Sequence, residues 1–393
     1  MEVLPKALAI VDAKRKDSKY PFSMLAGVGV VFKVIQAIVT KLGLDEKEYL
    51  KYLDLVCIGT ISDIVPLIDE NRVIAKLGLK LVEVTKNVGL KALMLSSGYK
   101  NIDSNMISFG IAPRINACGR MGYEAEALNL FLTESLTKAT EITDRLNKYN
   151  KERQDIEKTI YEEAISKLEK EDLSKLNGIV LASENWHHGV IGIVASKLTD
   201  LYYKPTILLC IEEEKAKGSG RSVPGFDLHD ALCKSGKYLE KDGGHEMAVG
   251  LTLKPENIEK FKLVFSEIIE KSEAFEQTQI IYIDKQIELK DLKTEVVEKI
   301  KMLEPFGEGN KMPMFLYRNL KIDSIRAWSE GKHLKLTLQD ESYIINAIGF
   351  GMGNLAEEYL IDDKIDVIGH LEINNFGGEE NVQINLKDIK RSY

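Results

Sequence analysis

The stretch LDLVCIGTISDIVPL, residues Leu53–Leu67, places the carboxylate of Asp63 within a largely apolar run. Removing an ionised carboxylate from water is costly unless a cation, a metal ion or several hydrogen-bond donors meet it. The nearby side chains supply only two hydroxyls and the thiol of Cys57. The pattern leaves two interpretations of Asp63 open: a metal-binding or catalytic residue, or a helix cap or turn residue.

The composition describes an ordinary globular protein. A length of 393 residues indicates two or three domains, and 44% apolar with 29% charged residues is typical of folded proteins. The net charge of −8 argues against indiscriminate coating of nucleic acid but allows a local basic groove. No cysteines form a C-x-x-C pair, so we expect reduced thiols, a cytoplasmic location and no structural zinc site; the four are Cys57, Cys118, Cys210 and Cys233.

The sequence shows no membrane or export signal. Met1–Ala13 lacks the basic start, apolar core and cleavage site of a signal peptide. Met24–Val39 is interrupted by Lys33 and Gln36 and is shorter than a membrane span. We therefore expect no membrane partner.

The first part of the chain has helical periodicity. Apolar residues at three- and four-residue spacing predict helices over 26–43, from about 45 through the Asp63 region, over about 71–86 and over 89–96. A charged segment from Glu134 to about Lys170 keeps the same spacing without Gly or Pro. It predicts one long amphipathic helix, or two nearly continuous ones, with a solvated charged face.

Between these helices, the segment Phe109–Met121 (FGIAPRINACGRM) contains two arginines. Arg114 and Arg120 are separated by small residues and the amide of Asn116, and Pro and Gly flank them. This composition predicts a loop whose guanidinium groups can bind phosphate oxygens. Surface arginines in a turn are the alternative.

From residue 178 strand and helix signals alternate, which predicts an α/β domain. Strands are expected over 178–182, 205–211 and 247–253, and helices over 189–203, 226–238 and 255–271. His187 lies where a strand ends and a helix begins, a position that favours an anion. The loops GSGRS at 218–222 and DGGH at 242–245 could bring hydroxyls, a guanidinium and an imidazole close to a ligand, although glycine-rich turns are commonly only turns.

The C-terminal part has short segments with period-two alternation, from about residue 314 to residue 386. They predict a small barrel of the OB type, whose open face binds single strands through stacking and basic groups. The candidates on that face are Trp328, Lys332, His333, Lys335 and Phe376. Trp328 could equally belong to the barrel core.

Several of these segments resemble one family. IGTISDIVPL at 58–67 resembles a metal-binding motif of the DHH phosphoesterases, in the form found in the RecJ family. APRINACGR at 112–120, HHGVIGIVA at 187–195, the GSGRS and GGH segments and EPFGEGN at 304–310 follow in the family's order, although Lys311 replaces the proline usual after that Asn. The resemblance covers essentially the whole chain.

The resemblance implies a role for each matching residue. It makes Asp63 the catalytic metal ligand. The residues it assigns to substrate binding are Arg114, Asn116, Arg120, His187, Ser219, Arg221, Ser222, Gly243, Gly244 and His245.

The resemblance also implies the architecture, an α/β plus β fold. Residues 1–133 would be the remnant of a DHH catalytic domain, and 134–175 a connecting helix. Residues 176–274 would form the DHH-associated α/β nucleic-acid-binding domain, and 275–393 an OB-fold domain.

The activity implied is 5′ to 3′ hydrolysis of single-stranded DNA in repair and recombination, with Mn²⁺ or Mg²⁺. Met1–Leu25 resembles the family segment that follows the Asp-His-His motif, so the other metal ligands would lie upstream. We therefore expect this chain to hold the metals weakly and to be inactive alone. The alternative is a non-catalytic single-stranded-DNA-binding or regulatory subunit. Under either interpretation, the expected partners of the chain are single-stranded DNA and either a separate N-terminal half or a single-strand-binding protein.

Overall fold

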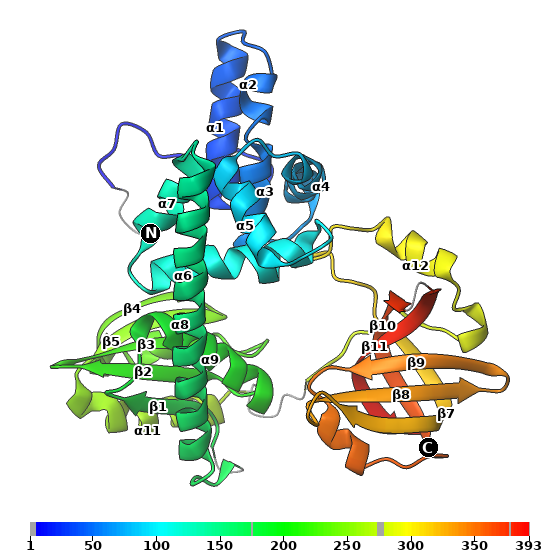
Figure 1. Cartoon of the computed structure of the whole chain (residues 1–393). Helices are drawn as coiled ribbons and strands as arrows, with labels where there is room; N and C mark the ends of the chain where they lie inside the picture. The colour runs from blue at the N-terminus through cyan, green and yellow to red at the C-terminus, as the bar shows by residue number, and fades with distance from the viewer. Residues whose placement is uncertain (1–4, 174–175, 273–278, 377–378, 393) are drawn as a thin grey trace. The chain divides into compact units, whose positions relative to one another are not determined.

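The structure is a computed structural model that describes residues 5–173, 176–272, 279–376 and 379–392 (Figure 1). The chain divides into two compact units. The first comprises Met1–Val84, Lys100–Ser108 and Ile281–Tyr393, and the second comprises Thr85–Tyr99 and Phe109–Ile280. Among the described residues, no helix is both long and apolar enough to cross a membrane.

The first unit begins with four helices. Their bounds are α1 Gly27–Lys41, α2 Lys47–Leu50, α3 Leu53–Ser62 and α4 Asp69–Glu83. A core cluster that includes Phe32, Tyr49 and Ile74 holds them together. The single helix predicted from residue 45 is interrupted between α2 and α3. Helices α3 and α4 can approach closely because Gly78 has no side chain. A Cβ at this position would lie 2.3 Å from the Cβ of Cys57.

The second unit begins with helices that pack on one long helix. Their bounds are α5 Val88–Ser97, α6 Ala112–Arg120, α7 Glu124–Leu132 and α8 Leu136–Leu168. The side chain of Ser135 caps α8 by accepting a hydrogen bond from the Lys138 amide. The predicted long helix is confirmed, and α5, α6 and α7 contact it. Its buried residues are mostly apolar, but Thr143, Asn150 and Glu157 are also buried, so not all of its charges lie on a solvated face.

The segment predicted as an arginine loop is helical. A π-helical turn, Met106–Ile111, leads into α6, and Pro113 occupies the first turn of α6. Proline is well tolerated there, because the first-turn amides have no partner within the helix. The prediction of a loop was wrong because Pro and Gly were taken as helix breakers without regard to their position.

A five-stranded sheet forms the centre of the second unit. Its strands are β1 Ile179–Ser183, β2 Thr206–Glu212, β3 Lys215–Arg221, β4 Leu239–His245 and β5 Ala248–Leu253. Their order is β1-β2-β3-β5-β4; only β1 and β2 pair in parallel. Helix α9, His188–Tyr202, packs with Leu208 of β2, whereas α10, Leu228–Lys234, and α11, Ile258–Glu270, share a core with Leu209. The predicted α/β domain is confirmed.

Two segments predicted as glycine-rich loops are strands. GSGR belongs to β3 at the centre of the sheet, and DGGH belongs to β4 at its edge. A Cβ on Gly218 would lie 2.6 Å from Cδ2 of Leu209, and one on Gly220 would lie 2.7 Å from Cγ2 of Val249. These glycines therefore make room for tight packing and do not form turns.

The C-terminal part is a barrel with its own core. Its strands are β7 Phe315–Trp328, β8 His333–Asp340, β9 Tyr343–Gly349, β10 Lys364–Phe376 and β11 Glu379–Arg391, preceded by β6 Lys285–Gln286 and α12 Thr294–Lys301. Pairing of β10 with β7 and of β11 with β9 closes the barrel. The predicted OB-type barrel is confirmed, and its first long strand, β7, has an irregularity after Ile322.

Candidate nucleic-acid interface

One face of the sheet carries a row of polar side chains beside an open floor. In the strand register Arg221 pairs with Ala248, which pairs with His245; in the next row of this face Ser219 pairs with Gly250, which pairs with Gly243. Paired residues point to the same face of a sheet. A Cβ on Gly243 or Gly250 would have no atom within 4 Å. The backbone there is therefore open to a ligand, and we call Ser219, Arg221, Gly243, His245 and Gly250 the sheet cradle.

Arg221 is fixed at the border of the sheet cradle. Its Nη1 donates to Oγ of Ser219 at 3.1 Å and to the carbonyl of Gly220 at 2.7 Å. A Cβ on Gly192 of α9 would lie 2.9 Å from that Ser219 oxygen and 3.1 Å from Nη2 of Arg221. Helix α9 therefore carries glycine at the point where it covers these two side chains.

A second guanidinium lies near the first. Nη1 of Arg120, at the end of α6, donates to the carbonyl of Gly189 at 3.0 Å. Burial lowers the pKa of both Arg120 and Arg221, and the repulsion between these two cations lowers the pKa of Arg221 further. Repulsion from Arg153 also lowers the Arg120 pKa, whereas attraction from Glu157 opposes that shift. An anion bound here would relieve this repulsion, which is the electrostatic character expected of a phosphate site.

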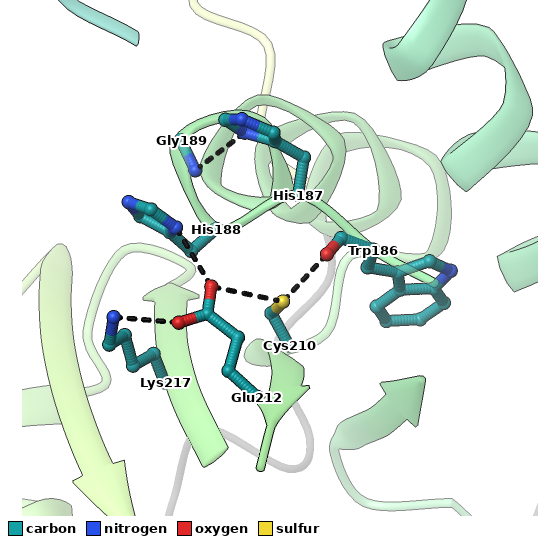
Figure 2. A network of polar contacts seen from close by, with 7 residues as sticks. All are labelled: Trp186, His187, His188, Gly189, Cys210, Glu212 and Lys217. Carbon is teal, nitrogen blue, oxygen red and sulfur yellow. Dashed lines mark hydrogen bonds and ion pairs between the residues drawn. The ribbon is translucent and has the colours of Figure 1, made fainter. Parts of the chain in front are cut away.

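His187 begins α9 and accepts a hydrogen bond from its first turn (Figure 2). Its Nδ1 accepts from the Gly189 amide at 3.1 Å, so the neutral ring carries its proton on Nε2. Burial, followed by repulsion from His188, lowers the pKa of His187. The neutral ring can therefore donate from Nε2 to an acceptor.

The neighbouring His188 belongs to a different network, which Figure 2 also shows. Its Nδ1 lies 3.0 Å from Oε1 of Glu212, whose Oε2 accepts from Nζ of Lys217 at 2.7 Å. The thiol of Cys210 donates to the carbonyl of Trp186 at 2.6 Å. The two adjacent histidines therefore have separate hydrogen-bond partners.

The remaining candidate residues of the second unit do not belong to the sheet cradle. Nε of Arg114 donates to Oδ1 of Asn147 at 2.6 Å, and its Nη1 donates to the carbonyl of Gly110. Asn116 is exposed on α6. Ser222 is buried and donates to the carbonyl of Phe226 at 2.7 Å, so its hydroxyl is used within the fold. Gly244 lies in β4 with φ 146° and directly over the backbone of Ala248.

In the first unit, Asp63 is exposed at the end of α3, where it is the C-terminal cap residue. Asp63 is therefore not buried, and the prediction that burial requires a partner for its carboxylate was wrong. The buried carboxylate of the stretch is that of Asp54, which is 5% exposed. The hydroxyls of Thr60 and Ser62 are buried and have no hydrogen-bond partner among the described residues.

The surroundings of Asp63 do not fit a pair of divalent ions. Within the described ranges, Asp63 belongs to no group of three or more His, Cys, Asp or Glu ligand atoms close enough to share an ion. Sites for such ions use several oxygen and nitrogen ligands. Among the described residues, Asp63 is thus joined by too few such ligands to hold a pair of ions, and no catalytic step can be derived from it.

The barrel carries an exposed aromatic group. Trp328 at the end of β7 is 53% exposed, which excludes the interpretation as barrel core. Its ring lies 5.8 Å from that of His333, and the His333 ring lies 5.3 Å from that of Phe350, which is 56% exposed. Phe350 was missed, because its contact with His333 depends on how β8 pairs with β9.

Basic side chains lie next to this aromatic group. Lys335 pairs with Arg326 across β7 and β8, in the row beside Trp328 and His333. Arg326 was also missed by sequence reasoning. Lys332 is exposed and donates to Glu330 at 3.1 Å. Phe376 ends β10, but its side chain lies outside the described residues.

Comparison with known proteins gives the affiliation. Family models described as "DHHA1 domain" and "RecJ OB domain" match residues 175–271 and 283–388. The chain is 38% identical to the single-stranded-DNA-specific exonuclease RecJ of Bacillus subtilis, over 98% of this chain and 49% of that protein. It is 32% identical to RecJ of Haemophilus influenzae, over 98% of this chain and 70% of that protein. This chain belongs to the RecJ family.

The likeness to RecJ extends to three dimensions. The crystal structure of RecJ from Thermus thermophilus in complex with Mn²⁺ has a TM-score of 0.88 and 28% identity, and the match covers 100% of this chain and 57% of that one. A structure of the same RecJ in complex with Mg²⁺ has a TM-score of 0.83. The chain thus spans about half the length of the Bacillus and Thermus relatives. The resemblance to RecJ and the predicted fold class are confirmed.

Proposed function

We propose that this chain binds single-stranded DNA as part of a RecJ-type 5′ to 3′ exonuclease of DNA repair and recombination. The observation that carries the proposal is the sheet cradle, in which Arg221, Ser219 and His245 border an open backbone floor beside Arg120. The two repelling guanidiniums, together with the neutral ring of His187 as a hydrogen-bond donor, suit a phosphodiester backbone. The exposed aromatic and basic side chains of the barrel suit unstacked bases.

We further propose that the 393 residues alone do not hydrolyse DNA. The family chemistry uses Mn²⁺ or Mg²⁺ to activate water and to stabilise the leaving oxygen. The described residues surround Asp63 with too few ligands for such ions. Activity then requires further ligands, supplied by another polypeptide or by additional sequence.

A binding assay tests the first proposal. We expect fluorescence anisotropy to show binding of a labelled single-stranded oligonucleotide that weakens strongly between about 50 and 200 mM salt, because phosphate contacts release counterions. Arg221→Ala should weaken binding about tenfold, equivalent to about 1.4 kcal/mol. Arg145→Ala is the matched control, since Arg145 pairs with Glu126 on the helices of the same unit. Equal losses in both variants, or no binding by the parent chain, would refute the assignment.

A nuclease assay tests the second proposal. The purified chain is incubated with the same labelled oligonucleotide in Mn²⁺ or Mg²⁺, and the products are resolved by length. We expect intact DNA. Robust cleavage that disappears in Asp63→Asn would show that these residues do assemble a metal site, whereas cleavage that persists in Asp63→Asn indicates a contaminating nuclease and calls for a cleaner preparation before the result is scored.

A further inference from the structure

Three metal-binding side chains meet on the face of the sheet opposite the sheet cradle. His229 and Cys233 lie four residues apart on α10, and Asp242 belongs to β4. Asp242 pairs with Leu251, whose side chain lies in the core beneath α10 and α11, so its row alternates with the row of Gly243. One ligand atom from each of the three residues lies within 4.8 Å of the other two.

The arrangement follows from elementary geometry. Residues at i and i+4 lie one above the other on the same side of a helix, so an imidazole and a thiol project together from α10. Nδ1 of His229 lies 3.9 Å from Sγ of Cys233. Tetrahedral zinc with Zn–N near ~2.0–2.1 Å and Zn–S near ~2.3 Å brings such atoms to roughly 3.6 Å. A small rotation of the His229 or Cys233 side chain would therefore bring Nδ1 and Sγ to the separation that zinc requires.

The chemistry of the donors selects the kind of ion. One nitrogen, one sulfur and one oxygen suit zinc, whereas Mg²⁺ and Mn²⁺ prefer oxygen ligands. Cys233 and Asp242 are exposed, so an ion and a completing water molecule can reach them. The nearby Lys234 pairs with Asp230 at 2.6 Å, and no ion pair of Asp242 is found within the described ranges.

We propose that His229, Cys233 and Asp242 bind one Zn²⁺ ion, with water in the fourth position. The site uses neither Asp63 nor any residue of the sheet cradle, and it does not depend on the proposed DNA binding. It joins α10 to the edge strand β4, one residue before Gly243-Gly244-His245. Bound zinc therefore restrains the strand that supplies one side of the sheet cradle.

Cobalt spectroscopy tests the proposal on the full reduced chain. Co²⁺ should give a thiolate-to-cobalt charge-transfer band in the near ultraviolet that saturates at one equivalent and disappears on addition of Zn²⁺. Cys233→Ser should abolish the band, and His229→Ala and Asp242→Asn should weaken binding at least about tenfold. Asp230→Asn on the same helix and Asp63→Asn should leave it unchanged. An absent band, or one retained in Cys233→Ser, would overturn the proposal.

Alkylation provides a second measurement that needs no variant. Among the four cysteines only Cys233 is exposed; Cys57, Cys118 and Cys210 are buried. Stoichiometric Zn²⁺ should slow the reaction of Cys233 with iodoacetamide at least about tenfold, as read by peptide mass spectrometry, because the metal-bound thiolate is shielded. Mg²⁺ should give no protection. An unchanged rate with Zn²⁺ would contradict the site even if every variant failed to fold.

Discussion

At the residue scale, the environment of His187 couples its protonation to the stability of the second unit. The groups that face its ring are His188, Glu212, Glu152 and the Gly189 amide, which donates to Nδ1. Burial and His188 together outweigh the two carboxylates and lower the pKa of His187. The folded protein therefore favours the neutral ring.

The sign of the pH effect follows from this shift. A lowered pKa means that the unfolded chain binds more protons, so the stability contributed by neutral His187 is complete above its usual pKa of about 6.5 and is lost as the pH falls through the folded-state value. We expect the urea concentration at the unfolding midpoint of the full chain to decrease when the pH is lowered from about 7.5 to about 5. The decrease should be smaller in His187→Asn, since Asn caps helices without titrating.

His188→Asn is the matched control for this prediction. His188→Asn removes the contact between the His188 ring and Glu212 and leaves the His187 cap in place. This variant should keep the fall in urea midpoint toward low pH, because burial is the larger cause of the lowered His187 pKa. If His187→Asn showed the same pH dependence as the parent chain, the cap would not be the titrating group.

Arg114 gives a second residue-scale prediction. Its hydrogen bonds to Asn147 and Gly110 join α6 to α8 and to the preceding turn. Arg114→Ala should lower the free energy of unfolding by about 2–3 kcal/mol, because hydrogen bonds of a partly buried charged group are lost. A double-mutant cycle with Asn147→Ala, measured by urea denaturation, should give a coupling energy of about 1 kcal/mol or more. A coupling near zero would refute the contact.

At the element scale, the glycines of β3 are required by packing. Gly218→Ala would place its Cβ 2.6 Å from side-chain atoms of Leu209 and Leu251, and we expect a loss of about 1–3 kcal/mol in the free energy of unfolding. Gly250→Ala in the neighbouring β5 is the control, because its Cβ meets no atom within 4 Å. Urea denaturation of the two variants should separate them clearly. Equal midpoints would show that the sheet adapts to the added methyl group.

Elements that are specified by the local sequence pattern could be predicted, whereas elements that depend on contacts between distant segments could not. Helix α8 and the barrel strands follow from local periodicity, so residues alone indicated them. Strands β3 and β4 could not be recognised, because their glycines are explained by side chains of neighbouring strands far away in sequence. The helical form of residues 112–120 depended on Pro113 occupying the first turn, a position that composition does not reveal.

The residues of the candidate site likewise fall into those that the sequence indicated and those that only the structure brings together. The motif residues around the sheet cradle were found through resemblance, and the strand register explains why they meet. Phe350, Arg326 and the His229–Cys233–Asp242 cluster were missed, because each depends on contacts between separate elements. Asp63 was taken as buried from its apolar neighbours, yet the end of α3 turns its carboxylate outward.

At the scale of the whole molecule, the barrel and the sheet have separate hydrophobic cores. The barrel core contains Leu336 and Tyr317, and the core beneath α10 and α11 contains Phe261. We therefore expect calorimetry to resolve more than one unfolding transition, since two-state behaviour is characteristic of single domains. Leu336→Ala should destabilise one transition by about 2–5 kcal/mol and Phe261→Ala another by about 3–5 kcal/mol. A single transition lowered equally by both variants would show one cooperative unit.

The tight turn between β2 and β3 has a consequence for how this protein family can diverge. Glu212 pairs with Lys215, so only Glu213 and Glu214 connect the strands, and Glu213 adopts a φ of 52°. Adding or deleting one residue here would slide β3 by one position and exchange its two faces, sending Ser219 and Arg221 into the core and the glycines outward. We therefore expect selection to remove insertions and deletions at this hairpin, although they accumulate elsewhere. The length of the connection should be kept even where its amino acids change.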